Sequence, residues 1–327
     1  MRLALAIAGL LLASGCGYIG PPKAPALHIP SAVQDLRAME FGDKVLVQFT
    51  VPMLTTDAIV QTSLRGADLY AGPAPQNFNR DQWASTATRV PIAVTAPGPV
   101  EKEFPVEPAW FGHEIVISVR VIGETGRFSD WSGFLVLGVN PPLATPAAFQ
   151  VVASPAGVAL RWTGSGPRYR VLRSMPDGPN ETDHALVPAG ESDTTEYVDT
   201  NAVYGTRYQY VVIAISGEQH QSLPSEPALI TPTDIFPPAV PANVTALPRP
   251  QSVDLAWTRN EEEDLQGYNV RRSVDMGPFE LIASLLPTPA YGDRGLESGK
   301  QYRYTVTAVD MVGNESVQSA PVTVVVP

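Results

Sequence analysis

The stretch GKQYRYTVTAVDMVGNES, residues 299–316, decides the fold class of this 327-residue chain. Apolar and polar residues alternate one for one from Tyr302 to Ala308. Such a period of two places one set of side chains on the buried face of a β-strand and the other set on its solvent face. The stretch therefore predicts a half-buried strand.

The same pattern occurs a second time, earlier in the chain. Tyr208 precedes Tyr302 by 94 residues, and Ser225 precedes Ser319 by the same 94. A V-x-L-x-W strand stands upstream in both copies, at 158–162 and at 253–257. Several matched motifs at one spacing indicate a duplicated structural unit.

A third, more divergent copy lies upstream at the same period. VLVQF at 45–49 takes the place of the V-x-L-x-W strand, with Phe49 for Trp, and Ile115 stands where the later copies have Tyr. Paired prolines at 141–142 and 237–238 fall between the copies. Proline fixes φ and withholds an N–H donor, so such pairs stiffen a junction. The three predicted domains comprise residues 31–140, 144–232 and 237–327.

The composition agrees with an all-β protein. Its 33 prolines are about twice the usual share, and proline suits strand edges and turns better than strand or helix interiors. No long segment has a helical period, and no apolar run after residue 15 approaches the 18 residues of a membrane-spanning helix. Short alternating strands in units of about 94 residues indicate two-sheet sandwiches.

These motifs resemble the fibronectin type III domains of bacterial exported proteins. The resemblance implies tandem immunoglobulin-like sandwiches, and it places a tyrosine corner at Tyr208 and at Tyr302. In such a corner the ring packs at a strand end and its hydroxyl bonds nearby backbone. The residues expected to build the cores are Phe49, Trp162, Tyr208, Trp257 and Tyr302.

The first 30 residues predict an export signal followed by a tether. A basic residue, a short apolar run at 3–12 and small residues after it are typical of a secretory signal peptide, here residues 1–15. The run Leu-Ala-Ser-Gly-Cys at 12–16 resembles the lipobox of bacterial lipoproteins. That resemblance implies cleavage between Gly15 and Cys16, and lipidation of Cys16, the only cysteine. An ordinary signal peptide with an incidental cysteine is the alternative.

Residues 16–30 are rich in Pro and Gly and predict an extended tether. Gly17 follows Cys16 where many inner-membrane lipoproteins of Gram-negative bacteria have Asp, which favours the outer membrane over the inner. The expected location is the cell envelope, on a membrane reached through palmitate-type acyl chains.

The net charge of −11 argues against nucleic acid as a partner. The acid run at 261–264 offers carboxylates of the kind that Ca²⁺ prefers, but it lacks the pattern of a calcium loop, and a solvated loop is the plainer interpretation. We expect no metal and no cofactor.

Three aromatic residues in an irregular stretch of the first copy, Trp83, Phe104 and Trp110, are candidates for binding a partner; filling a weaker core is the alternative. Trp131 lies in a Ser-Asp-Trp-Ser run and predicts a structural stack with arginine, Arg120 or Arg127.

Catalytic motifs are not found: the four histidines are scattered, and no nucleophile elbow, phosphate loop or zinc signature occurs. The sequence predicts a non-catalytic, membrane-anchored spacer, adhesion or assembly module that binds a protein in the envelope. The alternative is a polysaccharide-binding accessory protein for a hydrolase.

Overall fold

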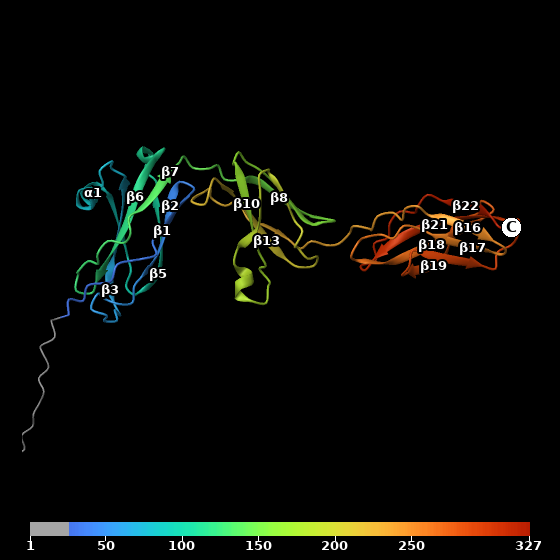
Figure 1. Cartoon of the computed structure of the whole chain (residues 1–327), viewed down its shortest axis with the longest axis horizontal. Coiled ribbons are helices and arrows are strands. Elements are labelled where there is room, and N and C mark those ends of the chain that lie inside the picture. Colours follow the sequence, from blue (N-terminus) through green and yellow to red (C-terminus); the bar gives the residue numbers. More distant parts are fainter. Residues whose placement is uncertain (1–25) are drawn as a thin grey trace, which may run out of the picture. The chain divides into compact units, whose positions relative to one another are not determined.

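The computed structural model describes residues 26–327, which fall into two compact units (Figure 1). Unit 1 runs to Pro142 and includes Gly217–Gln221; unit 2 comprises Leu143–Ser216 and Ser222–Pro327. The predicted signal peptide and Cys16 lie outside the described residues.

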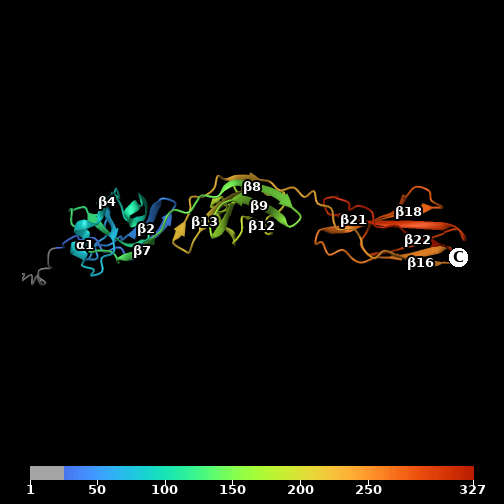
Figure 2. The same ribbon diagram turned by 90° about the horizontal axis from the view of Figure 1, so that it is seen from above.

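Unit 1 is a β-sandwich of one three-stranded and one four-stranded antiparallel arrangement, in the orders β1-β2-β5 and β4-β3-β6-β7 (Figures 1 and 2). A further short strand, β14 (His220–Gln221), pairs in parallel with β1. The other elements are β1 (Arg37–Phe41), β2 (Lys44–Val51), β3 (Leu64–Pro73), α1 (Arg80–Thr86), β4 (Thr88–Ile92), β5 (Gly98–Pro105), the 3₁₀ turn η1 (Pro108–Trp110), β6 (His113–Gly123) and β7 (Leu135–Val139).

The core of unit 1 follows from the alternation of β2. Val45, Val47, Phe49 and Val51 are buried, while the residues between them are half-buried or exposed. Ile115 on β6 is fully buried in the same core. Alternation along each strand thus assembles one apolar layer between the two sheets.

Unit 2 contains two sandwiches with the same strand order. The first pairs β8-β9-β12 and β11-β10-β13-β15, with bounds β8 (Ala147–Ser154), β9 (Gly157–Thr163), β10 (Arg168–Ser174), the 3₁₀ turn η2 (Glu181–His184), β11 (Val187–Ser192), β12 (Glu196–Asp199), β13 (Tyr208–Ile215) and β15 (Ala228–Ile230). The second pairs β16-β17-β20 and β19-β18-β21-β22, with bounds β16 (Thr245–Arg249), β17 (Ser252–Ala256), β18 (Leu265–Val274), β19 (Glu280–Leu286), β20 (Ala290–Arg294), β21 (Gln301–Asp310) and β22 (Val322–Val325). The predicted all-β fold of tandem two-sheet sandwiches is confirmed.

An indole against a phenol forms the centre of each sandwich in unit 2. The ring centroids of Trp162 and Tyr169 lie 5.3 Å apart, and those of Trp257 and Tyr268 lie 5.2 Å apart, both edge to face. All four residues are buried. Aromatic pairs in this geometry add about 0.5–1.5 kcal/mol to the stabilisation that burial of their area provides.

A tyrosine corner closes each of these two sandwiches. The Tyr208 hydroxyl accepts a hydrogen bond from the Val203 N–H (3.0 Å), and the Tyr302 hydroxyl accepts one from the Glu297 N–H (2.9 Å). Both rings are buried. The buried hydroxyl satisfies a backbone donor outside the strands and pins the chain where β13 and β21 begin.

Two serines in each sandwich support the strand that precedes them. Ser319 Oγ and Ser316 Oγ accept hydrogen bonds from Val306 N–H and Ala308 N–H on β21, both at 3.0 Å. The equivalent pairs are Val212–Ser225, Ala214–Ser222, Val119–Ser132 and Val121–Ser129. Each serine satisfies a buried backbone donor that would otherwise go unpaired.

Between residues 26 and 327, no helix is long and apolar enough to cross a membrane.

Candidate functional site

A helical insertion between β3 and β4 of unit 1 carries the candidate site. The Asn79 side-chain oxygen accepts hydrogen bonds from the N–H groups of Asp81 (3.1 Å) and Gln82 (3.0 Å), which caps the start of α1. The Ala87 N–H donates to the Trp83 carbonyl (2.9 Å) just beyond the helix end. The local sequence therefore defines both ends of α1.

Trp83 holds α1 against β3. Its side chain is only 3% exposed, and Gly72 on β3 allows the close approach. A Cβ placed at Gly72 would lie 3.1 Å from the Ala87 Cα and 3.7 Å from Trp83 Nε1. Within the described residues, Trp83 Nε1 is buried and has no hydrogen-bond partner.

Trp83 belongs to an aromatic cluster, which we define as Tyr70, Phe78, Trp83, Trp131 and Phe134. Ring centroids lie 6.0 Å apart for Trp83 and Trp131, 5.7 Å for Trp83 and Phe134, and 4.9 Å for Phe78 and Phe134. Tyr70 and Trp131 are also 4.9 Å apart. Four of the five rings are buried or half-buried, whereas Phe78 is 45% exposed.

Arg120 stacks between two aromatic rings at the edge of this cluster. Its guanidinium carbon lies 4.8 Å from the Phe128 ring centroid and 5.0 Å from that of Trp131. Its Nε donates to the Ser129 carbonyl at 3.0 Å. These contacts engage Arg120 in the structure of unit 1, and they give Trp131 the structural role expected from its sequence context.

A hollow of about 650 Å³ lies beside α1. Two prolines, three side-chain amides, one indole and one hydroxyl line it: Pro73, Pro75, Asn77, Asn79, Gln82, Trp83 and Thr86. None of these side chains carries a charge. The amides offer both donors and acceptors, and the rings offer apolar contact.

Phe104 and Trp110, the other two candidates from the sequence, lie elsewhere. Their ring centroids are 6.5 Å apart and both side chains are buried in the core of unit 1. Their position matches the alternative interpretation, in which they fill the core. Of the three aromatic candidates, the structure places Trp83 alone at a hollow.

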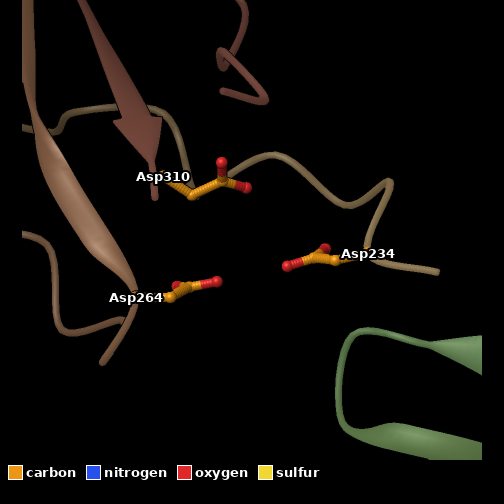
Figure 3. Close-up of side chains that lie close together, drawn as sticks. All are labelled: Asp234, Asp264 and Asp310. Carbon is orange, nitrogen blue, oxygen red and sulfur yellow. The ribbon is translucent and has the colours of Figure 1, made fainter. Parts of the chain in front are cut away.

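Three carboxylates meet at one end of the last sandwich (Figure 3). Asp234, Asp264 and Asp310 each offer an oxygen within 4.8 Å of the others, and burial together with the charges of Asp234 and Asp310 raises the pKa of Asp264. Asp310 is buried, and the backbone already stabilises its charge, because its Oδ1 accepts hydrogen bonds from the N–H groups of residues 312, 313 and 314. Three such oxygens fall short of the six to eight that Ca²⁺ takes.

Buried polar triads recur in unit 2 and were missed at the sequence level. Asp293 Oδ2 accepts from the Tyr304 hydroxyl (2.8 Å) and from Arg272 Nη1 (3.1 Å). Asp199 makes the equivalent contacts with Tyr210 and Arg173. Burial and the bonded carboxylate raise the pKa of both tyrosines. The signal was available, because the Asp and Tyr of each triad recur at 94 residues.

Glu315 is a carboxylate whose pKa is strongly lowered. Burial opposes its ionisation, but hydrogen bonds from Arg271, Thr307 and Asn269 outweigh this and lower its pKa to about 2. Arg271 Nη1 lies 2.8 Å and Asn269 Nδ2 3.0 Å from Glu315 Oε1. The network ties β18 and β21 to the segment after β21, which is a structural task.

Comparison with known proteins adds a chemical context. No family model matches the chain. It is 27% identical over 212 residues to a protein named exoglucanase B of Cellulomonas fimi, 39% identical over 87 residues to an amylopullulanase of Thermoanaerobacterium saccharolyticum, and 30% identical over 122 residues to an amylopullulanase of Thermoanaerobacterium thermosulfurigenes.

The matches cover 61%, 26% and 37% of this chain, but only 18%, 7% and 6% of those three relatives. The chain therefore spans less than a fifth of the length of these relatives. Among solved structures, the FN1–FN3 domains of chicken CNTN1 are 13% identical, with a TM-score of 0.29 over 91% of this chain and 98% of that one.

Proposed function

We propose that this protein is a non-catalytic accessory module for polysaccharide, held at a membrane by its amino-terminal lipid. The observation that carries the proposal is the sequence similarity, at 27–39% identity, to proteins named for acting on glucans. The sequence left a protein partner and a polysaccharide open, and this similarity favours the polysaccharide.

The structural roles of the residues that recur in the sandwiches support a non-catalytic function. The indole–phenol pairs, tyrosine corners, paired serines and Asp–Arg–Tyr triads all satisfy packing or hydrogen bonds inside a sandwich. The charged groups in these elements are paired within the fold, which leaves none of them free as an acid or base.

The anchor is part of the same proposal. Cleavage after Gly15 would expose Cys16, and acylation there would supply about 0.8 kcal/mol of membrane affinity per buried CH₂. Several acyl chains hold a protein where one chain alone is marginal. The tether at 16–30 would set the sandwiches away from the bilayer, with the outer membrane of the envelope as the expected site.

Two measurements test the proposal. The purified full-length chain should be retained by insoluble cellulose or by starch and should release no reducing sugar from either one. In cells, Cys16→Ser should lose incorporation of a labelled fatty acid and leave the membrane fraction. Failure to bind either polysaccharide would refute the carbohydrate role, and equal labelling of wild type and Cys16→Ser would refute the anchor.

A further inference from the structure

The hollow beside α1 has the chemistry of a sugar site. We propose that it binds a short segment of a neutral glucan, with Phe78 as the stacking ring and the amides of Asn77 and Gln82 as hydrogen-bonding groups. The inference rests on the proposed carbohydrate function and assigns that function to one place in unit 1.

The lining selects a neutral ligand rich in hydroxyls. Asn77, Asn79 and Gln82 each carry a primary amide, which can donate to one hydroxyl and accept from another. The Asn79 oxygen caps α1, so its NH₂ group remains for a ligand, while Asn77 and Gln82 are exposed. An anionic sugar would find no cation in this lining, because none of the lining side chains is charged.

The exposed ring of Phe78 provides the apolar contact. Phe78 lies between two lining residues, Asn77 and Asn79, and it is 45% exposed. Its inner side packs on Phe134 at 4.9 Å and on Trp83 at 5.9 Å between centroids. A large ring fixed from one side and open on the other can cover the C–H face of a pyranose without losing rotamer freedom on binding.

The insertion that carries the site is held in place. The cap at Asn79 and the contact of α1 with Gly72 define the position of the insertion. Trp83, which lines the hollow, is 97% buried and anchors this wall. Preformed concave sites with apolar walls and a few directed polar groups are typical of small-ligand binding, and about 650 Å³ is within their usual size.

The experiment measures the affinity of the full-length chain for three soluble probes by calorimetry. Cellohexaose and maltohexaose are the neutral probes, and a hexamer of polygalacturonate is the charged one. We expect a neutral probe to bind and the charged one to bind at least tenfold more weakly. The tryptophan emission of the chain should change on binding of the neutral probe.

Variants then locate the site. Phe78→Ala and the double variant Asn77→Ala with Gln82→Ala should each weaken binding about tenfold or more. Phe128→Ala is the matched control, since Phe128 is also an exposed aromatic of unit 1, 38% exposed, but it stacks on Arg120 and is not next to a lining residue of the hollow. It should leave affinity within about twofold. Circular dichroism and the Tm of each variant check that it folds.

The possible failures are distinct. If the wild type binds a glucan and both hollow variants bind it equally well, the site is wrong while the carbohydrate function stands. If the wild type binds neither neutral probe nor either polysaccharide, the site and the function both fail. Equal affinity for the charged hexamer would overturn the selection for a neutral ligand.

Discussion

The first and the last sandwich share one strand order but differ in what they add to it. In the last sandwich the residues 275–279 suffice to join β18 to β19, whereas in the first the residues 74–87, with α1, lie between β3 and β4. The last sandwich has Tyr302 and Tyr304 where the first has Ile115 and Ile117, all of them buried. The topology therefore needs buried side chains at these positions, not tyrosine.

Among the substitutions that test this comparison, removal of the central indole should have the largest effect on the free energy of unfolding. Trp257→Ala in the last sandwich should lower the free energy of unfolding by about 3–5 kcal/mol, because the cavity left beside Tyr268 cannot close. Phe49→Ala is the counterpart in the first sandwich and should cost a similar amount there. Denaturant unfolding measures both, and a loss below about 1 kcal/mol in either variant would contradict the assigned cores.

The packing of α1 against β3 is the second feature to test. Gly72→Ala should destabilise unit 1 by about 2 kcal/mol, because the new methyl group would force the insertion away from β3. Gly138→Ala on β7 is the matched control, since a Cβ there meets no atom within 4 Å. Thermal unfolding of the two variants should differ; similar Tm values would mean that α1 is not seated through Gly72.

The buried triad distinguishes the two sandwiches chemically. Tyr304→Phe should cost about 1.5 kcal/mol, because Asp293 loses a hydrogen bond inside the fold while its bond with Arg272 remains. The first sandwich has no such triad among its described residues. Unfolding free energies give the value, and a neutral substitution would show that Arg272 alone satisfies the carboxylate.

The smallest effect concerns pH. Since the folded state lowers the pKa of Glu315 from 4.5 to about 2, this group stabilises the last sandwich above pH 4.5 and loses that contribution as pH falls toward 2. Partial exposure reduces the contribution to about 1 kcal/mol. Glu315→Gln should flatten the stability between pH 5 and pH 2 relative to the wild type. An unchanged pH profile would contradict the Glu315 network.

The sequence predicts the strands well, because alternation is a local signal and the 94-residue period repeats it in each copy. The paired serines follow from the same period, since Ser225 and Ser319 stand at equal distances from their strands. The hollow does not follow, because its amides are ordinary surface residues until α1 and Gly72 bring them beside Trp83. The acid cluster is equally hidden, as Asp234 and Asp310 are far apart in the chain.

The burial of two core aromatics could not be predicted from the sequence either. Phe104 stands on β5, where three of the four residues before it are charged, and Trp110 lies in the 3₁₀ turn η1, so no apolar alternation marks either one as a core residue. Their burial depends on the pairing of β5 with β2, which alternation alone does not specify.

The proposed glucan site lies in the insertion of unit 1. Hydrogen exchange of the full-length chain, followed by mass spectrometry with and without cellohexaose or maltohexaose, tests it over the whole molecule at once. Binding at the proposed site should add protection in peptides that cover residues 73–87 and change little elsewhere. Protection confined to residues 144–327, with none in the insertion, would contradict it.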